Sequence, residues 1–240
     1  MPLSHRKDKT PFIQGVFAAI VFVPVLAPFA AIFGIFSASL DLSGFQTFMY
    51  SLVVLAGAAQ IASLSLLEQG APVLIAIFTG AILNLRMLMY SAALAPHFRG
   101  LSLKRRFLMA YGLVDQCFVL GQQRFENDPE ESAFDKSQYY LGIALVILTL
   151  WFSASMLGYY FGGLIPEKLD ISFGLPLSFI ALIAPSLKSP PHIVAAAISI
   201  IGALLFNAIP YNLGLLIAGV MAIIAAAEVE RRIDQRKQND

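Results

Sequence analysis

The sequence predicts an all-α protein, a polytopic bundle of transmembrane helices. Of its 240 residues, 58% are hydrophobic and only 13% are charged, and the mean hydropathy is +0.75. A soluble domain of this size needs a polar surface that such a composition cannot supply. The apolar residues also come in runs of about 20, the length of helix that crosses a hydrocarbon core of about 30 Å. Composition and run length together therefore place the chain in a membrane.

Eight apolar segments are expected, of which six or seven cross the membrane fully and some are broken or re-entrant. They are 11–36, 46–67, 72–95, 107–121, 139–162, 171–187, 191–208 and 211–229. The longest hydrophilic stretch, 122–138, is acidic and rich in turn-forming residues. It predicts a solvated loop between the two halves of one transporter domain, residues 1–240.

An internal repeat is a hypothesis at this point. The stretches 69–85 and 189–207 each run from a proline-containing turn through an apolar helix to an asparagine, Asn84 or Asn207. The two stretches do not align at one offset without gaps. We therefore carry an inverted repeat forward only as a hypothesis.

The basic residues predict the orientation of the chain. Lys and Arg gather at 6–9, 99–106 and 231–237, and such clusters mark the cytoplasmic side of a membrane rather than a nucleic-acid surface. Both termini are therefore expected in the cytoplasm. Three full crossings before residue 97 would put the second cluster outside. Either an early segment is broken or re-entrant, or the charge rule fails once.

Helix breakers in the early segments favour the first of these explanations. Segment 11–36 carries Pro24 and Pro28, and segment 46–67 carries "LAGAAQIAS". A proline inside a helix frees a carbonyl group, and in lipid such a group survives only inside protein or beside a wet cavity. Discontinuous helices point to the substrate site of a transporter, so the two prolines are candidates for lining a cavity. The alternative is that they only kink a helix for packing.

Arg86 is the one base among the 16 Lys and Arg residues that lies deep inside an apolar run. It stands roughly 15–20 Å from either end of its helix, and a lone charge at the bilayer centre costs about 3 kcal/mol or more. Its candidate partner is Asp115, a carboxylate inside another apolar segment. The two charges either form a structural bridge, or Arg86 binds an anionic group of the substrate while Asp115 exchanges protons or receives an ammonium group.

Neutral polar side chains accompany these charges in the apolar segments. Gln60 and Asn84 are candidates to contact substrate beside Arg86, and Ser63 and Asn207 are candidates to line the cavity. For each of them the alternative is an interhelical hydrogen bond worth about 1 kcal/mol.

Enzymatic chemistry has no support in this sequence. It has no HExxH, GxSxG or Walker motif, and its single Cys117 offers neither a disulfide framework nor a thiolate metal site. We expect no enzyme activity, no cofactor and no bound metal. Energy for transport would come from an ion gradient.

With these residues in view, the chain resembles the AzlC family of bacterial branched-chain amino acid permeases. The resemblance covers nearly the whole chain, and the second half adds little to it. It rests on "GVFAAIVFVPVLAPFAAIFG", "SLVVLAGAAQIASLSLL", "AILNLRMLMYSAALAP" and "GLVDQCFVL". Within these motifs, the "AGAAQ" and "NLR" elements, in that order and spacing, are the most specific.

The resemblance implies a function and a set of site residues. Such proteins are similar to the large subunit of a two-component exporter of valine, leucine and isoleucine, with methionine as a further substrate. The proton motive force drives export, and a small AzlD-like membrane protein is the companion. Gln60 falls in "AGAAQ", Asn84 and Arg86 fall in "NLR", and Asp115 matches an acidic position where relatives often have Asp-Glu. Here Gln116 follows, which puts a two-carboxylate proton relay in doubt.

Three classes of function stay open on the sequence. The first is a proton-coupled amino acid exporter in the inner membrane of a bacterium. The second is a passive channel, or a transporter of another small solute. The third is a membrane scaffold that does not transport and needs a partner.

Overall fold

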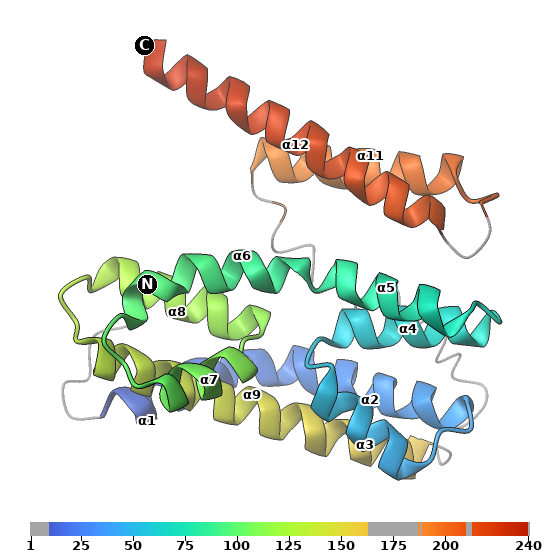
Figure 1. The fold of residues 1–240 in the computed structure, drawn as a ribbon, viewed down its shortest axis with the longest axis horizontal. Helices are drawn as coiled ribbons and strands as arrows, with labels where there is room; N and C mark the ends of the chain where they lie inside the picture. The colour runs from blue at the N-terminus through green and yellow to red at the C-terminus, as the bar shows by residue number, and fades with distance from the viewer. Residues whose placement is uncertain (1–9, 163–186, 188, 210–212, 240) are drawn as a thin grey trace. The chain divides into compact units, whose positions relative to one another are not determined.

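The computed structural model describes residues 10–162, 187, 189–209 and 213–239 (Figure 1). These residues form helices joined by turns, and no strand occurs among them. The predicted all-α fold is confirmed. The expected segment 171–187 lies outside the described residues except for Leu187.

Four helical stretches are long and apolar enough to cross a membrane, and one further apolar helix is shorter. The four are Pro11–Ser39, Val73–Phe98, Ala133–Phe161 and Leu213–Ile233, and the shorter one is Pro190–Leu205. Together with the interrupted helices described below, they make the chain a multi-pass membrane protein.

By proximity the described chain divides into two compact units. The first comprises Met1–Ala62 and Gly80–Ile171, and the second comprises Ser63–Thr79 and Ser172–Asp240. Within the described residues, the chain passes between the units twice, inside α4 and inside α5. The single transporter domain therefore stays a prediction.

The N-terminal stretch is helical without a break. It consists of α1 (Pro11–Ala19), a single 3-10 turn η1 (Ile20–Phe22) and α2 (Val23–Ser39). Pro24 lies in the first turn of α2, where a missing N–H costs little, and Pro28 lies inside the helix. The break that we expected here is therefore wrong, because the prolines cause only a local tightening.

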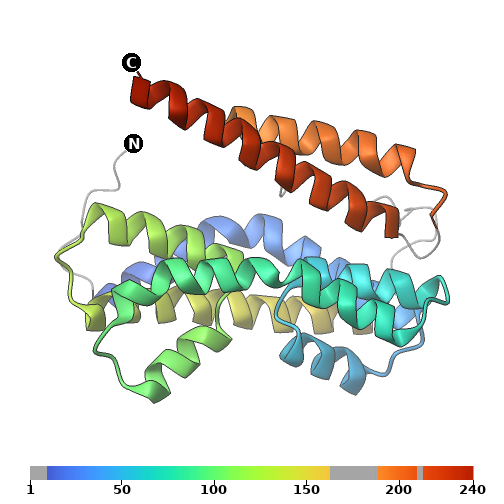
Figure 2. The same ribbon diagram turned by 45° about the horizontal axis from the view of Figure 1, so that its top comes forward.

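Helix α9 (Ala133–Phe161) packs against α1 and α2 along its length (Figures 1 and 2). Glycines bring the backbones together at both ends of the contact. Gly15 and Gly142 face each other's helices near one end, and Gly34 and Gly158 do so near the other. A Cβ atom at any of the four would overlap a carbonyl group of the facing helix. Small residues permit such close approach in membranes, where packing drives helix association.

Three of the expected helices are interrupted. The pairs are α3 (Gly44–Val53) with α4 (Gly57–Glu68), α5 (Val73–Leu83) with α6 (Leu85–Leu94), and α7 (Leu103–Tyr111) with α8 (Asp115–Asn127). The first break confirms the prediction from "LAGAAQIAS". The other two, at Asn84 and at 112–114, were not expected. A 3-10 turn η2 (Ala95–Phe98) follows α6.

The prediction of a solvated loop at 122–138 is largely wrong, because most of this stretch is helical. Helix α8 continues to Asn127 and α9 begins at Ala133, so only 128–132 connects them. The connection is fixed by contacts that the sequence pattern does not reveal. The Ser132 hydroxyl caps α9 by accepting the Asp135 amide, and the buried Lys136 ammonium donates to the Pro129 carbonyl at 2.7 Å.

The second unit contains two helical hairpins. In one, α4 turns into α5 at Gly70, whose φ of +72° favours glycine, and Leu66, Ala71 and Ala76 form its core. In the other, α11 (Pro190–Leu205) packs on α12 (Leu213–Asn239), with Gly202 against Ala218. Both carry one arm of the hypothetical inverted repeat, which stays a hypothesis.

The close approach of α2 and α9 predicts a large penalty for a side chain at Gly34. Gly34→Leu would push into the Ser155 carbonyl group, and we expect the free energy of unfolding in detergent to fall by about 3 kcal/mol. Gly80→Leu is the matched control, because no atom lies within 4 Å of a Cβ there. Equal losses for both variants in thermal or denaturant unfolding would contradict the close approach.

Candidate functional site

The first unit brings Arg86 and Asp115 together. Arg86 is the second residue of α6 and Asp115 is the first residue of α8, so both lie next to a helix interruption. An Nη2 atom of Arg86 lies 3.1 Å from Oδ2 of Asp115. Asp115, the candidate partner of Arg86 in the sequence, thus lies within ion-pair distance of it. Whether the pair is a structural bridge or a substrate site stays open.

The helix dipoles stabilise the negative charge of Asp115 and destabilise the positive charge of Arg86. A carboxylate in the first turn of α8 meets the partial positive charge of that helix end, whereas a guanidinium in the first turn of α6 meets the same sign of charge. Arg86 thus depends on a nearby anion. In the described chain that anion is Asp115.

The ion pair leaves hydrogen-bonding capacity unused. The side chains of Arg86 and Asp115 are 34% and 28% exposed, and they touch through one pair of atoms. Nε of Arg86, Oδ1 of Asp115 and Oδ1 of Asn84 are shielded from solvent, yet they have no hydrogen-bond partner in the described part of the chain. Asn84 occupies the N-cap position of α6 without capping it. Three polar atoms near the α5–α6 interruption are therefore available to a ligand.

An aromatic pair borders these charges. Tyr90 lies one turn after Arg86, Phe118 lies one turn after Asp115, and their rings stack with centroids 4.1 Å apart and an interplanar angle of 10°. The Tyr90 hydroxyl interacts with the charges of both Arg86 and Asp115. Sequence reasoning missed both rings, although their spacing from the two charges puts each on the same helix face as its charged neighbour.

The interruption at 54–56 is stabilised by two polar side chains. Gln60 is fully buried and donates its amide to the Val54 carbonyl. The Tyr111 hydroxyl donates to the Leu52 carbonyl at 2.9 Å. Because Tyr111 ends α7, this bond sets the interruption at 112–114 beside the one at 54–56. Gln60, which the sequence predicted as a substrate ligand, therefore also has a structural role, since it satisfies a carbonyl group at the interruption.

One face of α9 supports both of these interruptions. Gly57 packs so closely on the Trp151 ring that a Cβ there would overlap it, and Gly112 packs on the Ala144 side chain. Trp151 and Ala144 are seven residues apart on α9, which puts them on one helix face. The long helix thus holds both breaks in position along a single stripe.

The other predicted residues divide between the two units. Pro24 and Pro28 are exposed on α2. Ser63 is buried on α4, and Asn207 is exposed in the turn after α11; both belong to the second unit. Within the first unit, Arg86 pairs with Asp115 next to Asn84.

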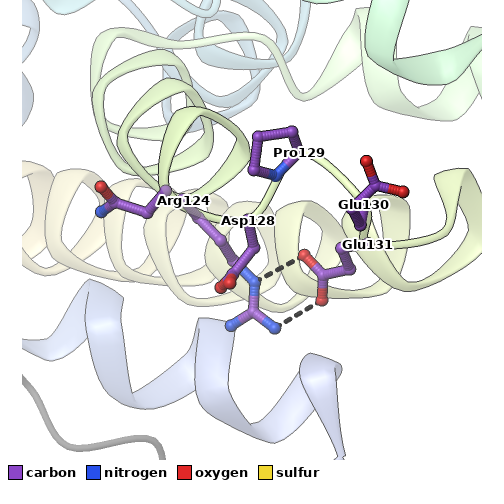
Figure 3. Close-up of a pocket in the computed structure, with 6 residues that line it drawn as sticks. Arg124, Asp128, Pro129, Glu130 and Glu131 are labelled. Carbon is purple, nitrogen blue, oxygen red and sulfur yellow. Dashed lines mark hydrogen bonds and ion pairs between the residues drawn. The ribbon is translucent and has the colours of Figure 1, made fainter.

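A second ion pair in the same unit is closed, which means that two hydrogen bonds join its side chains and little of either is exposed to solvent. Arg124 and Glu131 join through two hydrogen bonds and are only 14% and 13% exposed. Figure 3 shows the two side chains meeting beside the connection between α8 and α9. Arg124 also donates to Gln14 of α1 at 2.6 Å and lies over the Tyr139 ring. The hydrogen bonds that Arg124 donates to Glu131 raise the pKa of Arg124, so the guanidinium stays charged.

Interrupted helices beside a partly exposed ion pair are consistent with a membrane protein of the transporter type. The sequence pattern of the AzlC protein family matches residues 21–165, and the chain belongs to that family. The match contains all of Gln60, Asn84, Arg86 and Asp115.

Two relatives of this chain are named as membrane proteins. One is an uncharacterized membrane protein of Archaeoglobus fulgidus, 30% identical over 80% of this chain and 83% of its own length. The other is the inner membrane protein YgaZ of Escherichia coli, 23% identical over 80% of each chain. No solved structure matches the chain.

The bond between Tyr111 and Leu52 predicts a measurable contribution to stability. Tyr111→Phe removes only the hydroxyl and leaves a carbonyl of the α3 end without its donor, so we expect a loss of about 1 kcal/mol of unfolding free energy in detergent. Tyr160→Phe is the control, since Tyr160 is 68% exposed. If the Tyr111→Phe protein is as stable as the control, the hydrogen bond does not contribute to the free energy of unfolding.

Proposed function

We propose that this protein exports branched-chain amino acids across the inner membrane, with valine, leucine and isoleucine as its main cargo and methionine as a further one. The observation that carries the proposal is the open ion pair. Arg86 and Asp115 neutralise each other through a single contact, while atoms of both, and of neighbouring Asn84, stay unused.

An α-amino acid complements this arrangement group by group. Its carboxylate can take two parallel hydrogen bonds from the Arg86 guanidinium, the geometry that arginine presents best. Its ammonium group can bind Asp115 or the Asn84 oxygen. The stacked rings of Tyr90 and Phe118 lie beside the charges and offer an apolar surface to a branched side chain. Gln60 acts on cargo through the α3–α4 interruption that it holds.

Proton coupling in this proposal runs through Asp115. Deprotonated Asp115 receives the cargo ammonium from the cytoplasm while Arg86 takes the cargo carboxylate, so the zwitterion replaces the ion pair. A proton that arrives from outside neutralises Asp115 and displaces the ammonium, which favours release outside, and the return of protonated Asp115 carries that proton inward. Gln116 follows Asp115 in the chain and is buried, so one carboxylate serves this step.

The proposal includes a companion and an orientation. Membership of the AzlC family supports a small AzlD-like membrane protein as the partner, and the clusters of basic residues support cytoplasmic N- and C-termini. The function is transport rather than enzyme catalysis, with the proton gradient as the energy source.

The ion pair also supports a second candidate function. At 3.1 Å, Arg86 and Asp115 could serve only as a bridge within a subunit that does not transport. The closed pair of Arg124 and Glu131 argues against that use, because it has the two hydrogen bonds and low exposure that a permanent bridge needs. A bridge would gain from such closure.

Arg86→Lys is the first test. It keeps the charge but loses the paired hydrogen bonds, each worth about 1.5–3 kcal/mol to a charged group, so we expect valine efflux to fall by about tenfold or more. Efflux is measured in loaded cells that also produce the small companion protein, with membrane levels checked by immunoblot. Arg231→Lys, at an exposed surface pair, is the control.

Two outcomes would count against the first assignment. Unchanged efflux in Arg86→Lys would remove Arg86 from cargo binding. Full activity in the charge-swapped protein, Arg86→Asp with Asp115→Arg, would reduce the pair to a structural bridge.

Asp115→Asn tests the coupling. In vesicles loaded with valine, an imposed pH gradient should accelerate efflux by the unmodified protein and have no effect on the variant, because an amide does not exchange a proton in this way. Glu130→Gln, at an exposed connecting residue, should behave like the unmodified protein. Valine efflux that ignores the gradient in every variant would indicate a passive channel.

A further inference from the structure

The segment before the α7–α8 interruption is strongly cationic and has no internal counterion. It carries Arg99, Lys104, Arg105 and Arg106, while residues 69–114 contain no Asp or Glu. None of these four cations forms an ion pair within the described residues. The other described ion pairs show that arginines of this protein do pair where a carboxylate is in reach.

Helix α7 presents these cations from a fixed position. The Arg105 guanidinium lies 4.1 Å above the centre of the Phe134 ring of α9, and the Tyr140 hydroxyl of α9 donates to the Met109 carbonyl at 3.0 Å. Nε of Arg105 is shielded from solvent and has no hydrogen-bond partner among the described residues. A hydrogen-bond acceptor arriving at this edge of the guanidinium would satisfy it.

The outward side of α7 mixes the charges with large apolar side chains. Leu103, Phe107 and Leu108 are 72%, 75% and 57% exposed, and Lys104 and Arg106 are exposed between them. The start of such a helix fits the point where the chain enters a membrane surface, with its apolar side chains among acyl chains and its cations at the headgroups. Free phosphate would contact only the cations and would leave the apolar side chains of α7 exposed to water.

The position of the segment in the chain fits the same surface. The apolar stretch Val73–Phe98 is long enough to span a membrane, and Arg99 is the next residue. We propose that residues 99–108 form a binding site for an anionic phospholipid of the host membrane. Arg99, Lys104, Arg105 and Arg106 bind the headgroup phosphate, and Leu103 and Phe107 contact the acyl chains. The site does not depend on what the protein transports.

The test uses the full-length protein in detergent, where the direction of membrane insertion plays no part. The protein is titrated with phosphatidylglycerol and, separately, with phosphatidylcholine, and bound lipid is counted by native mass spectrometry. We expect tighter binding of phosphatidylglycerol. In Arg105→Gln/Arg106→Gln its affinity should fall about thirtyfold, or about fivefold for each charge removed.

Controls separate this site from general charge effects. Arg231→Gln/Arg232→Gln removes two exposed arginines that pair with Glu228, and it should bind phosphatidylglycerol like the unmodified protein. If circular dichroism shows that the first variant is misfolded, Arg99→Gln/Lys104→Gln replaces it, since neither residue touches the Phe134 ring.

Several results would overturn the proposal. They are equal affinity for the two lipids, an unchanged affinity in the folded variant, and an equal loss in the control. Displacement of phosphatidylglycerol by inorganic phosphate at a comparable concentration would do so too, because it would identify a site for free phosphate.

Discussion

The structure of the first unit depends on how backbone groups are satisfied where its helices stop inside the apolar chain. A helix end leaves carbonyl and amide groups without partners, and lipid supplies none. Here the α3 end is satisfied by Gln60 and Tyr111, two side chains from other helices. Those bonds fix one interruption next to another. Arg86 and Asp115 each lie beside such an interruption, where a helix can end because other groups of the protein satisfy its backbone.

Helix α9 supplies the rigid frame for this arrangement. Its glycines let α1 and α2 approach to backbone contact, and its Ala144 and Trp151 receive the glycines beside two interruptions. Membrane helices gain no hydrophobic advantage from leaving lipid, so their association rests on close packing and a few hydrogen bonds. A single long helix that provides both kinds of contact explains why short half-helices can keep fixed positions around it.

The sequence revealed the membrane class, a break within "LAGAAQIAS" and two charges that each need a partner. Asp115 could be named as a candidate partner of Arg86 because each charge is costly alone in an apolar run, but the sequence left open whether they pair with each other or with substrate. The interruption at Asn84 was not predictable in this way, because "AILNLRMLMY" has no glycine or proline. The helical continuation of α8 to Asn127 was also missed, since its polar residues look like a loop until Arg124, Glu131 and Lys136 are seen to find partners.

The sequence by itself therefore determined the solvent in which this protein folds, its helical class and the residues whose charge demands a partner. These follow from hydrophobicity and charge, which are properties of residues one at a time. Only the tertiary structure decided which interruptions meet, that Tyr90 and Phe118 border the ion pair, and that Gln60 and Tyr111 serve freed carbonyls. Those outcomes depend on contacts between segments far apart in the chain, which local sequence patterns do not predict.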